Sequence, residues 1–418
     1  MTALNIAMLT TFYPPYNFGG DGIGIQRLAV ALADRGHSIT VVHDEDAYIS
    51  QAGKVPAPID MDPRIRTIGL KSHLGAVSNL LVHQFGQPVT HAGRLKSLLA
   101  PGNYDVIWHH NASLVGGPGL FGLGDPGAVR LYEAHEHWLV CPTHVLWKNK
   151  REVCEKKACI RCQLAYRRPP QPWRWTGMLS RATRHIDAFI AKSEFSRDKH
   201  RAFGFLPDME VVPYFLPDVP IVSKPSSPHP RPYFLFVGRL EQIKGVQDII
   251  PAFSGNAGDG PDLVIIGAGD YEARLRAQAA GMERVIFKGR LQPESLAAWY
   301  GSANALIVPS LCYETFGIIL IEAFRGGTPV IARRLGPFPE IIAKGGGVLF
   351  ENAEELRSAI AELGNNKARR DSLASEARTA FEKNWKEDVV ITEYLDVVRK
   401  AARSKGNQRV ISALGDRA

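Results

Sequence analysis

Short apolar runs alternate with longer amphipathic stretches through most of this chain. In the first half, the runs that predict buried strands are Leu4–Thr11, Ser38–His43, Val106–His109 and Ala188–Ala191. In the second half they are Tyr233–Val237, Leu263–Ile266, Val285–Lys288, Ala305–Val308 and Pro329–Ala332. Helical periodicity predicts helices at Ile25–Arg35, Tyr271–Ala280 and Glu294–Ser302. This alternation predicts an α/β fold, with parallel sheets covered by helices.

The two halves are separated by residues 216–232, LPDVPIVSKPSSPHPRP, whose prolines and serines are typical of an interdomain linker. We therefore predict an N-terminal domain over residues 1–215 and a second domain over residues 233–384. An apolar stripe that includes Trp385, Val390 and Tyr394 predicts a helix over residues 385–405 that needs a docking surface. The polar tail, residues 406–418, is expected to fray.

Composition places the chain among ordinary globular proteins. It has 418 residues, of which 45% are apolar and 22% charged. No apolar run approaches the ~20 residues of a membrane helix, and the start lacks the basic segment and cleavage site of a signal peptide. We therefore expect a cytoplasmic protein in a reducing compartment.

Residues 309–332, PSLCYETFGIILIEAFRGGTPVIA, carry the most informative motif. The pattern predicts a strand, a loop containing Glu314, and a helix that begins near Phe316 or Gly317 and contains Glu322. A helix start offers unpaired N–H groups and a positive dipole end, which suit a phosphate. The two carboxylates, which are separated by seven residues, can accept hydrogen bonds from sugar hydroxyls. Together these groups could hold a nucleotide-sugar.

Two further segments predict phosphate contacts. In FVGRLEQIKG, residues 236–245, Arg239 and Lys244 follow a strand and can clamp a diphosphate and stabilise its charge as it leaves. The loop FYPPYNFGGDGIG, residues 12–24, lies between a strand and a helix, and its Gly19 and Gly20 allow close approach of a ligand to the backbone.

The glycine loop also admits two other interpretations. One is a plain tight turn. The other is a dinucleotide-binding fingerprint, which fails on glycine spacing although Asp44 and Glu45 stand at about the distance expected of a ribose-binding acid.

Together these motifs resemble the family-4 retaining glycosyltransferases with the GT-B fold, whose signature is E-x7-E. The resemblance implies two Rossmann-like domains facing across a cleft and a C-terminal helix that crosses back to the first domain. It implies that Glu322 holds the ribose, Glu314 contacts the donor sugar, and Arg239 and Lys244 bind the diphosphate. Donor binding by Phe316, Gly317 and Ile318 follows from their place at the helix start.

Other roles implied by the resemblance concern weaker motifs. Gly19 and Gly20 would face the donor, and Gly267 and Arg290 would lie near the base, although Gly267 and Gly269 could be plain turn glycines. In LYEAHEHWLVCP, residues 131–142, the family has a histidine that points at the donor sugar. Glu136 stands where the family usually has Asp, so His135 is the better match and His137 the alternative. Catalysis would then involve His135, Glu314, Arg239 and Lys244. Metal binding by the His-Glu-His cluster is a further alternative.

Four cysteines follow: Cys141, Cys154, Cys159 and Cys162, with 12, 4 and 2 residues between them. In a reducing compartment this spacing favours a structural zinc site over free thiols or disulfides. The chain would thus belong to a subgroup with a four-cysteine insertion at about residues 141–175. No cofactor is expected for catalysis.

The net charge of +8 is concentrated in residues 141–184, where eleven Lys or Arg and two acids give a local charge of +9. Trp173 and Trp175 lie in this segment and are expected on an exposed turn. Such a patch suits an anionic membrane surface or a phosphate-bearing acceptor, and a solvated basic face is the alternative. A nucleic-acid module is a minor idea, and we expect no nucleic-acid partner.

We therefore expect a retaining hexosyltransferase that moves a sugar from a nucleotide-diphosphate donor to a glycan or lipid-linked acceptor, in glycan, polysaccharide or glycolipid biosynthesis. UDP is the favoured nucleotide, from family frequency. Catalysis is expected to be metal-independent, and peripheral membrane association is a further expectation. The main alternative is a GT-B sugar-nucleotide epimerase. A phosphorylase would need pyridoxal phosphate and usually a longer chain, and a pure binding module would show no turnover.

Overall fold

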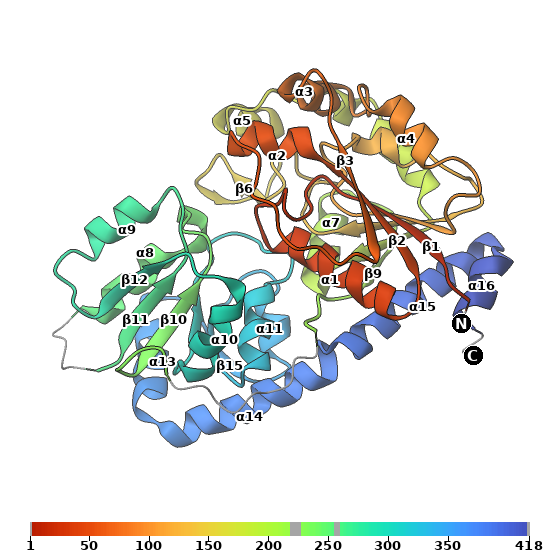
Figure 1. The fold of residues 1–418 in the computed structure, drawn as a ribbon. Coiled ribbons are helices and arrows are strands. Elements are labelled where there is room, and N and C mark those ends of the chain that lie inside the picture. The colour runs from red at the N-terminus through yellow and green to blue at the C-terminus, as the bar shows by residue number, and fades with distance from the viewer. Residues whose placement is uncertain (1, 218–226, 255–259, 416–418) are drawn as a thin grey trace. The chain divides into compact units, whose positions relative to one another are not determined.

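The computed structural model describes residues 2–217, 227–254 and 260–415 and divides the chain into two compact units (Figure 1). The N-terminal domain comprises Met1–Tyr214 and Glu387–Ala418, and the C-terminal domain comprises Phe215–Lys386. The predicted boundaries stood at residues 215 and 385. Most of the predicted linker, residues 218–226, lies outside the described residues.

The N-terminal domain is built on a seven-stranded sheet in the order β3-β2-β1-β4-β5-β8-β9. All neighbouring pairs in it are parallel. Its strands are β1 (Asn5–Leu9), β2 (Ser38–Asp44), β3 (Ile65–Leu70), β4 (Val106–His109), β5 (Val129–Ala134), β8 (Ala188–Ala191) and β9 (Met209–Val211). β4 and β5 are buried at every residue, as expected of strands covered on both faces.

The helices of this domain connect successive strands or follow the second domain. They are α1 (Gly20–Asp34), α2 (Glu45–Ala52), α3 (Ala76–Phe85), α4 (Ala92–Leu98), α5 (Cys159–Ala165), α6 (Met178–Ala182), α7 (Glu194–Ala202), α15 (Glu387–Lys405) and α16 (Gln408–Leu414). Short 3-10 turns occur at η1 (Gly117–Leu120), η2 (Pro172–Trp175) and η3 (Thr183–His185). A small antiparallel hairpin, β6 (Trp147–Lys148) with β7 (Glu152–Val153), lies in the four-cysteine segment.

The C-terminal domain contains a six-stranded parallel sheet in the order β12-β11-β10-β13-β14-β15. The strands are β10 (Tyr233–Val237), β11 (Asp262–Ile266), β12 (Val285–Gly289), β13 (Leu306–Val308), β14 (Val330–Arg333) and β15 (Gly347–Phe350). The helical segments are η4 (Gln242–Lys244), α8 (Val246–Ile249), η5 (Ile250–Phe253), α9 (Glu272–Gln278), α10 (Pro293–Ser302), α11 (Ile318–Arg325), α12 (Phe338–Ile342), α13 (Ala353–Asn365) and α14 (Lys367–Asn384). The prediction of two Rossmann-like parallel-sheet domains is confirmed.

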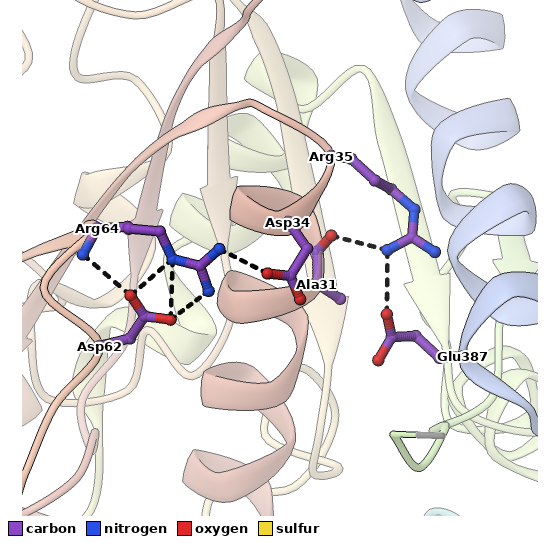
Figure 2. Close-up of polar contacts among 6 residues, drawn as sticks. All are labelled: Ala31, Asp34, Arg35, Asp62, Arg64 and Glu387. Carbon is purple, nitrogen blue, oxygen red and sulfur yellow. Dashed lines mark hydrogen bonds and ion pairs between the residues drawn. The ribbon is translucent and has the colours of Figure 1, made fainter. Parts of the chain in front are cut away.

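Helix α15 packs on the N-terminal sheet, which provides the docking surface that its apolar stripe requires. It contacts α1, β5 and β8, and Val390, Tyr394 and Val398 are buried. Figure 2 shows Arg35, at the end of α1, in contact with Glu387 at the start of α15, with 3.1 Å between Nη1 and Oε1. The prediction of a C-terminal helix that returns to the first domain is therefore confirmed.

Two local expectations differ from the structure. Helix α1 begins at Gly20, five residues before the predicted start, so the glycine loop ends at Gly19, its N-cap. The tail after Lys405 was expected to be frayed, but α16 follows, capped by the Asn407 side chain, which accepts from the backbone N–H of Val410. Val410 and Leu414 are buried, and this burial explains why a short helix forms there.

None of the helices within the described ranges is long and apolar enough to span a membrane.

Candidate functional site

In the C-terminal domain, Lys244 and Glu314 form an ion pair near the carboxyl ends of the strands. The Lys244 Nζ lies 2.6 Å from the Glu314 Oε1, and the Ser310 hydroxyl donates to the same oxygen at 3.1 Å. The side chains remain 22% and 24% exposed, respectively. Lys244 ends η4 after β10, and Glu314 lies in the loop between β13 and α11. The fold therefore brings together two predicted residues separated by 70 positions.

The electrostatics keep this pair ionised. Burial raises the pKa of Glu314, but the nearby Lys244 ammonium and hydrogen bonds from Lys244 and Ser310 outweigh it, so that the pKa lies below its ordinary value. Burial lowers the pKa of Lys244, and the Glu314 carboxylate more than reverses that effect, so that this pKa is raised. The result is a fixed ammonium beside a carboxylate, both within reach of solvent.

Glu322 lies in α11, and its carboxylate accepts a hydrogen bond from the Tyr300 hydroxyl at 3.0 Å. Tyr300 lies in α10 and was not predicted as a site residue. No motif near it indicates a hydrogen bond to a residue 22 positions away in the chain. The bond holds one carboxylate oxygen in place. It thereby orients the side chain that we expected to hold a ribose.

Helix α11 begins directly after Gly317, which has a φ of +115°. A Cβ at this position would lie 2.8 Å from the Phe338 ring, so both the backbone conformation and the space require glycine. Phe316 is buried before it and Ile318 is partly exposed after it. This turn presents the first N–H groups of α11, whose dipole end favours an anion.

The remaining predicted donor residues of this domain lie in strand-end loops. Arg239 follows β10, is exposed, and pairs with Glu241, with 2.8 Å between Nη1 and Oε1. Gly267 follows β11, and a Cβ there would lie 1.8 Å from the Gly238 carbonyl oxygen. Close backbone packing therefore requires glycine at this position, whether or not it contacts a ligand. Arg290 follows β12 and is exposed.

In the N-terminal domain, His135 follows β5 and is buried. Its Nε2 lies 3.0 Å from the His110 Nδ1, and its Nδ1 lies 2.5 Å from the Tyr214 hydroxyl. Burial, together with His110 and Lys192, holds the pKa of His135 well below its ordinary value against the opposing effect of Glu133. A neutral ring engaged on both sides would have to give up one of these partners to contact a sugar.

The alternative histidine, His137, is buried beside His200, with 5.2 Å between the ring centroids. Glu136 contacts His144 at 2.8 Å. Within the part of the chain that the structure describes, His135, Glu136 and His137 do not form a set of three ligand atoms close enough to share a metal ion. The geometry therefore gives no support to a metal site built from this motif.

A buried polar network around Glu133 was not anticipated. The Glu133 carboxylate contacts Lys192 and accepts from the Tyr394 hydroxyl at 2.6 Å, and its other oxygen lies 3.3 Å from His110. These residues come from β5, the segment after β8, α15 and the segment after β4. No local pattern could reveal the network, because Glu133 and Tyr394 are 261 positions apart.

Gly19 and Gly20 stand at the start of α1, where Gly20 is exposed and Gly19 partly so. Two more glycines of this motif have packing roles. A Cβ on Gly24 would lie 2.5 Å from the Tyr214 ring, and one on Gly22 would lie 2.4 Å from the Asn17 Oδ1. Gly24 therefore makes room for the tyrosine that contacts His135.

The four cysteines share one neighbourhood of the N-terminal domain. Burial and, to a smaller extent, the neighbouring Cys141, Cys159 and Cys162 raise the pKa of Cys154 to about 11. The backbone N–H of Asn149 donates to the Cys162 Sγ at 3.3 Å. All five cysteines of the chain are free in the structure, so the disulfide interpretation finds no support.

The spacing of these thiols is looser than a bound zinc requires. Tetrahedral zinc places sulfur atoms about 3.8 Å apart, whereas no three of the described cysteine sulfurs all lie within 4.8 Å of one another. The donor set fits zinc in chemistry, in burial and in its N–H···S bond. The sulfurs would have to move closer together on binding.

One of the two tryptophans predicted to be exposed in the basic segment, residues 141–184, is buried. Trp175 is 57% exposed, but Trp173 is only 4% exposed. The Trp173 indole N–H donates to the His83 carbonyl at 2.9 Å, and the Arg174 guanidinium stacks on its ring. The prediction of two exposed tryptophans is therefore wrong for Trp173, because α3 supplies an acceptor that buries the ring.

Two family models match the chain. The model described as Glycosyltransferase Family 4 matches residues 18–218, and the model described as Glycosyl transferases group 1 matches residues 221–380. Each match covers most of one of the two domains. Together with the fold, these matches support a glycosyltransferase of the GT-B type.

Curated relatives carry glycosyltransferase names. A phosphatidyl-myo-inositol mannosyltransferase of Mycobacterium leprae is 32% identical over 186 residues, which are 43% of this chain and 49% of that protein. One of the same name from Propionibacterium freudenreichii is 25% identical over 349 residues, which are 80% of this chain and 79% of that protein. For three relatives that are 30–32% identical, the match spans about half of the relative's own length, at 49%, 46% and 48%.

Solved structures share the fold. Sucrose-phosphate synthase from Thermosynechococcus elongatus has a TM-score of 0.72 at 19% identity and covers 96% of this chain and 100% of its own. The HepE protein of Anabaena in complex with UDP has a TM-score of 0.62 at 16% identity and covers 95% of this chain and 100% of its own. At these identities the likeness shows the GT-B fold alone.

Proposed function

Because its two domains match glycosyltransferase family models on a GT-B fold, we propose that this protein is a retaining glycosyltransferase. It moves a sugar from a nucleotide-diphosphate sugar to an acceptor hydroxyl. The observation that carries the proposal is the arrangement in the C-terminal domain of the Lys244–Glu314 pair and Glu322 around the start of α11. These groups supply a cation for the diphosphate, hydroxyl acceptors for the sugars, and a helix dipole that favours an anion.

Each side chain has a proposed role. Glu322, oriented by Tyr300, accepts hydrogen bonds from the ribose hydroxyls, and Glu314 accepts from the donor sugar while its other contacts hold it beside Lys244. Arg239 exchanges its surface partner Glu241 for the diphosphate. His135 contacts the donor sugar, Gly19 and Gly20 face the donor, and Gly267 and Arg290 lie near the base.

The proposed chemistry depends on position and charge. As the glycosidic bond to the diphosphate breaks, negative charge grows on the leaving oxygen. We propose that Lys244, Arg239 and the first N–H groups of α11 stabilise that charge. Retention requires the acceptor hydroxyl to attack from the face that the leaving phosphate occupies, and the phosphate can take up the acceptor's proton. In this account, the protein groups serve in place of a catalytic metal.

We take UDP as the first candidate nucleotide. HepE of Anabaena, a solved structure that shares the fold, forms a complex with UDP-glucose. GDP-mannose is the second candidate, because a relative that is 27% identical over 228 residues is named GDP-mannose-dependent. Both nucleotides present the same diphosphate to Lys244 and Arg239, so these residues alone do not choose between them.

For the acceptor we propose a glycan or lipid-linked hydroxyl, reached by peripheral binding to an anionic membrane. Exposed Trp175 and the +9 charge of residues 141–184 support this. A cavity of about 360 Å³ with Trp175, Leu206 and Arg174 in its wall offers both apolar and cationic contacts. Vesicle flotation tests the idea. Binding should rise with anionic lipid, fall with salt, and weaken in Trp175→Ala, and equal recovery on neutral and anionic vesicles would contradict it.

The transfer reaction is tested with a panel of nucleotide-sugars, by following nucleotide release with and without acceptor extracts. Release that depends on acceptor, together with a product that keeps the donor's anomeric configuration, is the expected result. Interconversion of sugars or release of UDP without any acceptor would favour the epimerase. Tight donor binding without turnover under either condition would indicate a binding module.

We also propose that Cys141, Cys154, Cys159 and Cys162 hold one structural zinc ion. Protein purified without added metal should contain about one zinc per chain. Cys162→Ser should release it, whereas Cys312→Ser, which alters the buried cysteine of the other domain, should not. Four titratable thiols and no zinc in folded wild-type protein would contradict the site.

A further inference from the structure

A second group of chemistry-bearing side chains lies in the N-terminal domain and has no part in the proposed transfer. Asp44 ends β2, Asp46 lies in the first turn of α2, and His91 directly precedes α4. The three residues are 0%, 4% and 3% exposed. Two acids and an imidazole are therefore buried together where three elements meet.

The geometry of this Asp44–Asp46–His91 cluster is that of a ligand set. One oxygen from each carboxylate and one ring nitrogen all lie within 4.8 Å of one another. The His91 Nε2 and the Asp46 Oδ2 are 4.0 Å apart, which is too far for a hydrogen bond. Ligands of one metal ion are spaced at up to roughly 4 Å, twice a bond length of about 2.1 Å. A small contraction would therefore bring all three to a common ion.

Two atoms of the cluster are left without partners. Within the described ranges, neither the Asp44 Oδ2 nor the His91 Nε2 has a hydrogen-bond partner. The other Asp44 oxygen, Oδ1, caps α2 by accepting from the backbone N–H of Ala47 at 2.9 Å. A buried carboxylate oxygen and a buried ring nitrogen that bond to nothing are costly. Such atoms in a native protein call for an explanation such as a bound ion.

Asp46 is already held in place. Its Oδ2 accepts from both the backbone N–H and the hydroxyl of Ser72, each at 2.8 Å. These bonds fix the orientation of the carboxylate. Metal ligands in proteins are commonly oriented in this way, by hydrogen bonds from residues that do not bind the metal themselves. The cluster thus combines one positioned carboxylate with two unsatisfied ligand atoms.

We propose that Asp44, Asp46 and His91 bind a divalent metal cation that links β2, α2 and α4. Two carboxylates and one imidazole are ligands suited to Mn²⁺, Zn²⁺ and similar ions. An ion at this place neutralises two buried carboxylates and satisfies both unpartnered atoms. Its role is structural, because the cluster is buried and fixes three elements of one domain.

A second buried cluster of this domain is a weaker candidate for a metal site. His110, Glu133 and His135 also place their ligand atoms within 4.8 Å of one another. There the Lys192 ammonium contacts the Glu133 carboxylate and supplies the positive charge that a metal would bring. Among the described residues, no Lys or Arg forms an ion pair with Asp44 or Asp46.

The test uses Mn²⁺ as the probe, because thiolates of the four-cysteine segment compete poorly for it. Purified full-length protein is titrated with Mn²⁺ and followed by electron paramagnetic resonance and by thermal unfolding. We expect about one tight Mn²⁺ per chain and a rise in Tm on binding. Asp44→Asn and His91→Gln should weaken binding about tenfold or more and abolish the rise. Asp62→Asn, which alters an aspartate of the same domain that pairs with Arg64 (Figure 2), should change neither.

Asp44→Asn keeps the helix cap, because Asn is as good an N-cap as Asp. Without metal this variant should be at least as stable as the wild type, since it removes a buried charge. It therefore separates loss of the metal from loss of the fold. Absence of tight Mn²⁺ binding, or equal binding and Tm response in the wild type and in both cluster variants, would overturn the proposal.

Discussion

Each domain contains a Lys–Glu ion pair near the carboxyl ends of its parallel strands, and the two pairs are buried to very different extents. Lys192 and Glu133 of the N-terminal domain are 0% and 1% exposed, whereas Lys244 and Glu314 of the C-terminal domain are 22% and 24% exposed. The residue types are the same. What differs is the number of protein groups around each pair and its access to solvent.

The buried pair is surrounded by protein partners. Glu133 also contacts His110 and accepts from Tyr394, a residue of α15. The pair thus ties the returning C-terminal helix to the N-terminal sheet. In the partly exposed pair, Glu314 also accepts a hydrogen bond from the Ser310 hydroxyl, and the Lys244 ammonium can be reached by a ligand's phosphate. We infer that burial separates a structural pair from a ligand-binding pair.

The largest effect is expected for Lys192→Met. It leaves the Glu133 carboxylate buried without its cation, and such a loss typically costs about 3–5 kcal/mol in the free energy of unfolding. Denaturant unfolding of the full chain measures it. Lys244→Met is the matched control and should cost less than about 1 kcal/mol, because its partner stays partly solvated. Similar stability losses in the two variants would contradict the comparison.

Glu322→Ala should act on activity and leave stability nearly unchanged. It removes the proposed ribose acceptor, and we expect a loss of about 2–4 kcal/mol in transition-state binding, from kcat/KM in a verified transfer assay. Glu272→Ala, which removes a surface partner of Arg276 in the same domain, is the control. Wild-type kinetics for Glu322→Ala would refute its place in the donor site.

Tyr394→Phe tests how much the buried network around Glu133 contributes to stability. The change removes only the hydroxyl that donates to Glu133 at 2.6 Å. A hydrogen bond to a charged group contributes about 1.5–3 kcal/mol, so the unfolding free energy should fall by that amount. If stability does not change, the hydrogen bond from Tyr394 to Glu133 does not help to hold α15 on the sheet.

Arg35→Ala should have the smallest effect. Arg35 joins α1 to α15 through Glu387 (Figure 2). It also pairs with Asp388, whose side chain is 78% exposed. Surface ion pairs contribute about 0–1 kcal/mol. Thermal unfolding at low and high salt should show a small loss that salt removes, and a loss as large as that of Lys192→Met would reverse the ranking.

The two regions also differ in how far the sequence could predict them. Strand–loop–helix patterns are local, and therefore the segments around Arg239, Lys244, Glu314 and Glu322 could be located from short motifs. The Glu133 network depends on the sheet order β4-β5-β8 and on the docking of α15. Neither the order of the strands nor the docking of α15 produces a pattern in nearby residues of the sequence.

Burial of side chains in irregular segments was equally hard to predict. Trp173 is buried because the His83 carbonyl of a separate helix accepts its N–H. The tail beyond Lys405 forms α16 because Val410 and Leu414 find a surface to cover. Both segments are rich in polar residues, and we therefore predicted that they would be exposed. The tertiary partners decided the outcome.

The assignment of Lys244 to the donor diphosphate is tested most simply by the affinity of the protein for the isolated nucleotide. Calorimetric titration with UDP and with GDP compares the wild type, Lys244→Met, and Lys367→Met, which alters an exposed lysine paired with Asp371 in the same domain. We expect at least one nucleotide to bind the wild type and Lys367→Met equally well. Lys244→Met should bind it about 10–100-fold more weakly, which corresponds to the loss of one charged hydrogen bond. Equal affinity in all three proteins would contradict the assignment of Lys244 to the donor diphosphate.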